Sequence, residues 1–189
     1  AVSHLVDKAG VRRADIVTSV VGVPGIISAD SASVIEAGAL RAIEGDGFAA
    51  RLSYELGLRI TLDNDVNLMA LGEQSVGLGR DVENFATVSI GSGMGAGLVL
   101  AGKLYRGAHG GAGEIHLTPF REVAPAGVQG DPASEGLEEA AARTVRRRRG
   151  SSLSAPFDSV QVFAAARNGD LAALEVLDSE IRAVSLYLT

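Results

Sequence analysis

The chain has 189 residues, no cysteine and a net charge of −6, with 47% hydrophobic and 4% aromatic residues. The acidic balance argues against a domain that binds nucleic acid by itself, because phosphate contacts need a basic surface. Disulfides and thiolate zinc sites are excluded, and no apolar run reaches the roughly 18 residues needed to cross a membrane. We expect a cytoplasmic α/β protein with a core of Ala, Val, Leu and Ile.

The first part of the chain alternates between helical and strand patterns. The predicted elements, in chain order, are helix 1–10, strand 15–25, helix 48–57, strand 59–62 and helix 66–77. The first strand is rich in Val and Ile and ends in the loop GVPG. Residues 63–65, Asp-Asn-Asp, are expected to form a polar loop with several possible N-caps for the helix that follows.

The second part begins with strand patterns and ends with helical ones. Strands are predicted at 85–91 and 97–107, the latter interrupted by a turn at 101–103, and helices at 135–150, at 160–169 and behind Asp170 as N-cap. The run 146–149, four arginines, is expected to be a solvated helix end. The last helix carries an apolar stripe that is expected to face a core, or else to pack on a missing lobe or a second subunit: Leu171, Leu174, Leu177, Ile181, Val184 and Leu188.

The stretch SIGSGMGAGLVL, residues 89–100, has alternating glycines. Gly91, Gly93 and Ala96 fit the spacing of a dinucleotide-binding fingerprint, but that motif must open a helix, and the pattern here continues as strand and turn. A hairpin between two strands is therefore predicted. Its backbone N–H groups, with the Ser92 hydroxyl, could form an anion-binding nest, or the tip could bind nothing.

Two carboxylates stand where a ligand could reach them. Asp65 follows the end of a predicted strand and could take a proton from a hydroxyl nucleophile, or could simply be an N-cap. Glu114 ends the glycine-rich loop GAHGGAGE and could accept hydrogen bonds from vicinal hydroxyls, or could be a solvated side chain.

Taken in order, GVPG, LDNDVN, SIGSGMGAGLVLAGKLYRGAHG and GAGEI resemble the ROK family (repressors, open reading frames and sugar kinases) along most of the chain. The resemblance implies the actin-like ATPase, ribonuclease-H-like fold, an α/β architecture of two lobes with mixed sheets. The chain would hold residues 1–64 as the remainder of the first lobe and 65–189 as the second, and would be incomplete at both ends.

The resemblance also implies roles for individual residues. In family kinases the residue matching Asp65 is the general base, those matching Asn64 and Glu114 hold sugar hydroxyls, and the loop with Gly25 lies near the sugar. The glycine hairpin would be the second phosphate-binding loop, with these residues at the cofactor: Gly91, Ser92, Gly93 and Gly95.

Two departures from the family pattern bear on function. The sequence contains no Asp-x-Gly-Gly-Thr loop, which in family kinases cradles the ATP phosphates. It also lacks the cysteines of the family's zinc site, and His116 is one place away from the ligand position, which Leu117 occupies. We therefore expect no structural zinc and no other metal site.

The pattern as a whole favours the sugar-sensing domain of a ROK-type transcriptional regulator, close to its cysteine-free members. The alternative is an ATP-dependent sugar kinase that uses ATP and Mg²⁺, with Asp65 as base; a third possibility is a remnant that binds nothing. The expected partners are a sugar or sugar phosphate and a second copy of the chain, with DNA reached only through a module outside this sequence and with no membrane.

Overall fold

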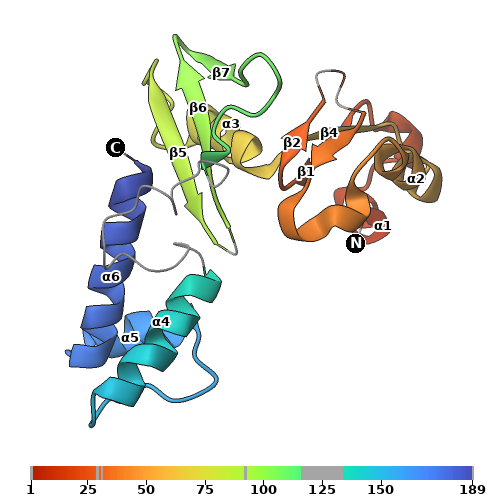
Figure 1. Ribbon diagram of the computed structural model, residues 1–189. Coiled ribbons are helices and arrows are strands. Elements are labelled where there is room, and N and C mark those ends of the chain that lie inside the picture. The colour runs from red at the N-terminus through yellow and green to blue at the C-terminus, as the bar shows by residue number, and fades with distance from the viewer. Residues whose placement is uncertain (1, 29, 31, 92, 116–133, 189) are drawn as a thin grey trace. The chain divides into compact units, whose positions relative to one another are not determined.

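The computed structural model describes residues 2–28, 30, 32–91, 93–115 and 134–188. Two compact units are distinguished (Figure 1). The N-terminal unit comprises Ala1–Val88 and Ala96–Glu114, and the C-terminal unit comprises Ser89–Gly95 and Ile115–Thr189.

The elements of the first 76 residues are, in order, α1 (Val2–Ala9), a 3₁₀ turn (Arg13–Asp15), β1 (Ser19–Val23), β2 (Ile26–Ile27), β3 (Val34–Glu36), a 3₁₀ segment (Gly38–Ile43), α2 (Gly47–Leu56), β4 (Ile60–Asn64) and α3 (Asp65–Val76). The elements that follow are β5 (Phe85–Ile90), β6 (Met94–Leu100), β7 (Lys103–Tyr105), α4 (Ser134–Arg147), α5 (Ser159–Arg167) and α6 (Leu171–Tyr187).

Strands β1 and β4 form a parallel pair in the N-terminal unit. Their register runs from Ser19 opposite Ile60 to Val23 opposite Asn64. Both strands therefore end at the same edge, which is where α/β proteins place ligands. The loop after β1 and the start of α3 after β4 meet at this edge.

The connection between β4 and α3 is tighter than predicted. The expected polar loop at 63–65 is wrong: the strand continues through Asp63 and Asn64, and the helix begins at Asp65 without an intervening loop. Asn64 can end a strand and cap a helix at once because its backbone is extended (φ −65°, ψ 138°), as an N-cap requires. The short antiparallel pair β2 and β3 was also not predicted.

The glycine-rich stretch is a hairpin, as predicted. Strands β5, β6 and β7 form one sheet in that order, and β6 turns into antiparallel β7 through Ala101 and Gly102, both at positive φ. A strand follows the glycines, so the dinucleotide fingerprint does not apply. Helix α3 lies close to β6, since a Cβ added at Gly97 would be 2.6 Å from the Val66 carbonyl oxygen.

Each unit has its own buried cluster. The N-terminal cluster consists of Val23, Ile27, Val34, Ala37, Ala49 and Leu62. The C-terminal cluster lies among α4, α5 and α6 and consists of Leu137, Ala140, Ala141, Leu153, Val162, Ala165, Ala166, Ala173 and Val176. Alanine predominates in the second cluster, which allows the three helices to approach one another closely.

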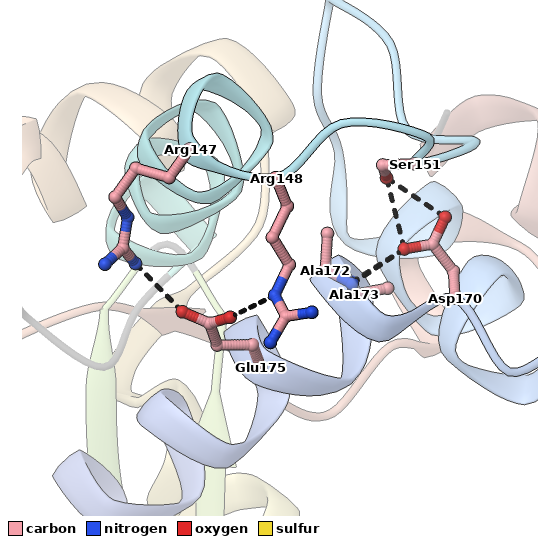
Figure 2. A network of polar contacts seen from close by, with 7 residues as sticks. All are labelled: Arg147, Arg148, Ser151, Asp170, Ala172, Ala173 and Glu175. Atoms are coloured by element: carbon pink, nitrogen blue, oxygen red, sulfur yellow. Dashed lines mark hydrogen bonds and ion pairs between the residues drawn. The ribbon is translucent and has the colours of Figure 1, made fainter.

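Helix α6 begins at Asp170, the predicted N-cap, whose carboxylate accepts hydrogen bonds from the N–H groups of Ala172 and Ala173 (Figure 2). The expectation that its apolar stripe faces a core within this chain is wrong for Leu171, Leu174, Ile181 and Leu188, which are exposed, although Leu177 packs against the C-terminal cluster. The face that packs is formed by small residues, including Ala172, Ala173 and Val176, whereas Leu171 and Ile181 are each 64% exposed.

The arginine run at the end of α4 is also more structured than expected. Arg147 and Arg148 both donate to the carboxylate of Glu175 on α6, at 2.9 and 2.7 Å (Figure 2). These cations hold the pKa of the Glu175 carboxyl below its usual value, Arg148 through its hydrogen bond having the larger effect.

The two units are defined by contacts within the chain, and the predicted lobe boundary between residues 64 and 65 stays a prediction. No helix in the described part of the chain is long and apolar enough to cross a membrane.

Candidate functional site

The side chain of Asn64 organises the edge at which β1 and β4 end. Its Oδ1 accepts the N–H of Asn67 at 2.9 Å and so caps α3. Its Nδ2 donates to the carbonyl oxygen of Gly25 at 3.0 Å and to Oε1 of Glu114, also at 3.0 Å. Three residues singled out in the sequence for sugar contact therefore lie together in the N-terminal unit.

Asp65, the fourth of these residues, is the first residue of α3 and is exposed. Its Oδ1 accepts the N–H of Val66 at 2.9 Å, and in the described part of the chain its carboxylate makes no other hydrogen bond. The carboxylate is thus anchored to the helix but keeps capacity for a ligand.

Two glycines have conformations that no other residue could adopt here without strain. Gly25 has φ +95°, and an added Cβ would lie 1.8 Å from the carbonyl oxygen of Glu36. Gly113, beside Glu114, has φ +90°, and its Cβ would lie 1.7 Å from the carbonyl oxygen of Ala96. Since the Ala96 N–H also donates to the Gly113 carbonyl at 2.8 Å, the loop carrying Glu114 is held against β6.

A pocket of about 380 Å³ opens beside this cluster. It is lined by Ile27, Ser28, Asp63, Asn64, Asn67, Arg106, Gly107, Ala108 and Gly110. Asp63, at the end of β4, forms an ion pair with Arg106, just after β7, at 2.6 Å. This pair links the β4–α3 junction to the loop that leads to Glu114.

The sequence pattern did not single out Asp63, Asn67 or Arg106. A signal was present for Asn67, which lies three residues after the N-cap in LDNDVN, on the same side of α3 as the cap. Arg106 is distant in the sequence from Asp63, and only the fold brings the two together.

Of the predicted phosphate-binding residues, Gly91 and Gly93 lie between β5 and β6 in the C-terminal unit, and Gly95 lies in β6. The Gly91 N–H donates to the Gly93 carbonyl at 2.8 Å, and a Cβ at either residue would meet no atom within 4 Å. Packing therefore does not require glycine at these two positions. Ser92 lies outside the described residues, so the predicted nest is not tested.

No group of three or more His, Cys, Asp or Glu side chains that could hold a metal ion is found among the described residues. His116 lies outside them, and the expectation of no structural zinc stays a prediction.

The sequence and the fold were compared with those of known proteins. The sequence matches the ROK family over residues 1–188. It is 39% identical over 99 residues to a putative xylose repressor of Caldicellulosiruptor sp. (strain Rt8B.4), which covers 52% of this chain and 25% of the repressor. It is 29% identical over 180 residues to a glucokinase of Halalkalibacterium halodurans, which covers 88% of this chain and 54% of the glucokinase.

Among solved structures, a ROK family glucokinase from Streptomyces griseus in complex with glucose and AMPPNP superposes with a TM-score of 0.77 at 22% identity. That superposition covers 98% of this chain and 66% of the glucokinase. The fold is thus that of the actin-like ATPases, as expected. The chain belongs to the ROK family.

The chain spans about a quarter of the length of the xylose repressor and about half of that of the glucokinase. The relatives of this chain include both a putative repressor and a sugar kinase.

Proposed function

We propose that this chain is the sugar-sensing domain of a ROK-type transcriptional regulator. The observation that carries sugar binding is the convergence of Gly25, Asn64 and Glu114 at one sheet edge, beside an exposed Asp65. Carboxylate and amide groups with fixed positions are suited to hydrogen-bonding the hydroxyls of a sugar. A cysteine-free sequence and the 39% identity to a putative xylose repressor support the regulator.

In this proposal the domain acts in the cytoplasm as a homo-oligomer, and DNA is bound by a module outside this sequence. Binding of a sugar or sugar phosphate would shift the full-length protein between conformations that bind DNA and conformations that do not. Light scattering on the full-length protein tests whether it forms a homo-oligomer, and the molar mass of a monomer at all concentrations would contradict this part of the proposal.

Sugar binding is tested by calorimetry on the full-length protein with D-glucose and D-xylose as probes. We expect heat from at least one of them, and an affinity about tenfold weaker or more in Glu114→Gln, because a hydrogen bond to a charged acceptor is lost. Glu55→Gln, an exposed change on α2, is the control and should bind as wild type does. No heat with either sugar would favour a chain that binds nothing.

A sugar kinase is the second candidate, favoured by one observation: Asp65 keeps free hydrogen-bonding capacity at the start of α3. Its carboxylate would accept the proton of a sugar hydroxyl as that oxygen attacks a phosphoryl group. ATP and Mg²⁺ would supply the phosphoryl group and the charge neutralisation, and the hairpin residues Gly91, Ser92, Gly93 and Gly95 would bind the phosphates; an added Cβ at Gly91 or Gly93 would meet no atom within 4 Å.

The two candidates differ in turnover. If the protein is a regulator, the full-length protein should not phosphorylate a bound sugar with ATP. Sustained turnover would overturn the regulator proposal. If turnover is found, Asp65→Asn should reduce kcat by about 100-fold or more, as expected for the loss of a general base, with little change in sugar affinity. An unchanged kcat would remove Asp65 from the base role.

A further inference from the structure

The helices α4 and α6 of the C-terminal unit line a pocket of about 650 Å³. Its polar lining consists of Arg143, Thr144, Arg146 and Arg147 on α4 and Glu175 and Ser179 on α6. None of these residues belongs to the proposed sugar site or to the glycine hairpin. Because three arginines share the pocket with a single carboxylate, cations predominate in its wall.

The carboxylate of this wall is already shared between two cations. Glu175 accepts from Arg147 at 2.9 Å and from Arg148 at 2.7 Å. Figure 2 shows both arginines reaching Glu175 from the end of α4. One negative charge therefore serves two guanidinium groups, and part of their positive charge stays uncompensated.

The other two arginines of the pocket are less engaged. Arg146 donates Nε–H to the Ala142 carbonyl of its own helix at 3.1 Å and forms no ion pair among the described residues. Arg143 lies 3.6 Å from Glu139, which is longer than a hydrogen bond. The Glu139 side chain is 74% exposed, so solvent screens this pair. The wall thus keeps a positive charge that its neighbours do not neutralise.

Thr144 adds an unused hydroxyl to the same wall. The residue is only 4% exposed, and its hydroxyl forms no hydrogen bond in the described part of the chain. The oxygen is not sealed inside the protein, because the one fully buried side-chain N or O atom found without a partner among the described residues is Oδ1 of Asn67. A threonine hydroxyl can donate to an anionic oxygen.

These groups suit a phosphate better than other anions. A phosphate monoester carries close to two negative charges and three acceptor oxygens at neutral pH, and guanidinium forks bind such oxygens in pairs. A carboxylate ligand would add only one charge. The net charge of −6 on the chain opposes a long polyanion such as DNA. The dipole of α4 also opposes an anion at its last turn, but its partial charge of about half a unit is smaller than the charge of the arginines.

We propose that this pocket binds a small phosphorylated molecule, whose phosphate group accepts hydrogen bonds from Arg143, Arg146 and Arg147. Glu175 holds the end of α4 against α6 and competes with the ligand for Arg147. The site does not depend on sugar binding, because it is formed only by helices of the C-terminal unit, whereas the proposed sugar residues belong to the N-terminal unit.

The first test removes a cation from the pocket. Calorimetry on the full-length protein at fixed salt, with inorganic phosphate and glycerol 3-phosphate as probes, should show heat with both. Arg146→Gln should weaken their binding about tenfold, because a charge-assisted hydrogen bond is lost. Arg182→Gln is the matched control. It makes the same change of charge on α6 outside the pocket, where Arg182 pairs with Asp178 at 2.8 Å, and it should bind as wild type does.

The second test removes the competing carboxylate. Glu175→Gln releases Arg147 and Arg148 and should tighten phosphate binding about fivefold. Asp178→Asn removes an equal charge from α6 outside the pocket and should leave the affinity unchanged. Weaker binding by Glu175→Gln, with an unfolding midpoint in urea equal to that of wild type, would contradict the competition and overturn the site.

The remaining outcomes are decisive in the same way. No heat from either probe with the wild type overturns the proposal. Binding that Arg146→Gln leaves unchanged would place the phosphate elsewhere, for example at the glycine hairpin, and equal weakening by Arg182→Gln would show only a general charge effect. A short DNA duplex that binds more tightly than glycerol 3-phosphate, and is weakened by Arg146→Gln, would replace the small ligand by DNA. Absence of sugar binding would leave this site standing.

Discussion

Asn64 joins three parts of the N-terminal unit through one side chain. It caps α3, donates to the carbonyl of Gly25 after β1, and donates to Glu114 at the end of the glycine loop. Aspartate is an equally good N-cap, but its carboxylate has no hydrogens to donate. The two donated bonds, and not the cap, therefore explain why an amide stands at this position.

Gly25 provides a prediction at the scale of a single residue. Gly25→Ala should destabilise the protein by about 3 kcal/mol or more, because left-handed strain adds to a clash with the Glu36 carbonyl. Gly45→Ala is a matched control, since Gly45 has φ +93° but open space around an added Cβ. It should cost only the strain, about 1 kcal/mol. Equal losses of unfolding free energy in urea would contradict the clash.

At the scale of elements, Asp170 connects α6 to the segment that precedes α5. Its carboxylate accepts from the Ser151 hydroxyl and from the N–H groups of α6 (Figure 2). It also accepts from the Ser152 N–H at 2.6 Å and from the Ser152 hydroxyl at 2.8 Å. The pKa of Asp170 lies well below its usual value. The hydrogen bond from the Ser152 N–H lowers it most, and the Ala173 N–H lowers it further.

A lowered pKa in the folded state makes stability depend on pH. The ionised Asp170 contributes fully above the unfolded-state pKa of 3.8, and its contribution is lost as the pH falls below that value toward the folded-state pKa. Asp170→Asn keeps a capping oxygen but cannot ionise. We therefore expect the stability difference between wild type and Asp170→Asn to shrink between about pH 6 and about pH 2, as measured by urea unfolding.

Asp170→Ala removes the cap as well and should cost about 2 kcal/mol at neutral pH. Ser154→Ala, an exposed change in the same segment, serves as the control. If wild type and Asp170→Asn showed parallel pH profiles, ionisation of Asp170 would not contribute to stability.

At the scale of the whole molecule, the two buried clusters share no residue. One combines strands with α2 and is built around Leu62, whereas the other lies among three helices and is built mainly from alanine and valine. Two separate cores allow local openings to occur in one unit at a time.

Leu62→Ala tests this separation. Leu62 is 0% exposed, so the change should destabilise the N-terminal unit by about 3 kcal/mol. Hydrogen exchange should become faster in β1, β4 and α3 and should stay unchanged in α4, α5 and α6. Leu78→Ala, at a side chain 95% exposed, should leave exchange unchanged everywhere. Faster exchange in both units would show that they open together.

Much of the site could be read from local patterns, and some of it could not. The capping residues Asn64 and Asp170 were within reach because a cap acts on the next few residues. The apolar stripe of α6 was misjudged because helical spacing identifies a face without saying what covers it, and alanines packed instead. Asn67 and Arg106 were missed because a buried, unpaired amide and a pairing across 43 residues have no local signature.

The sequence by itself determined the family, the order of the longer helices and strands without β2 and β3, and the identity of Asn64, Asp65 and Glu114 as candidate ligands, because these depend on short motifs and local periodicity. Only the tertiary structure decided that Asn64 donates its amide hydrogens to Gly25 and Glu114 and that the Oδ1 of Asn67 is buried without a partner among the described residues. Hydrogen-bond capacity is shared among neighbours in space, so which group remains free for a ligand is settled only when the chain has folded.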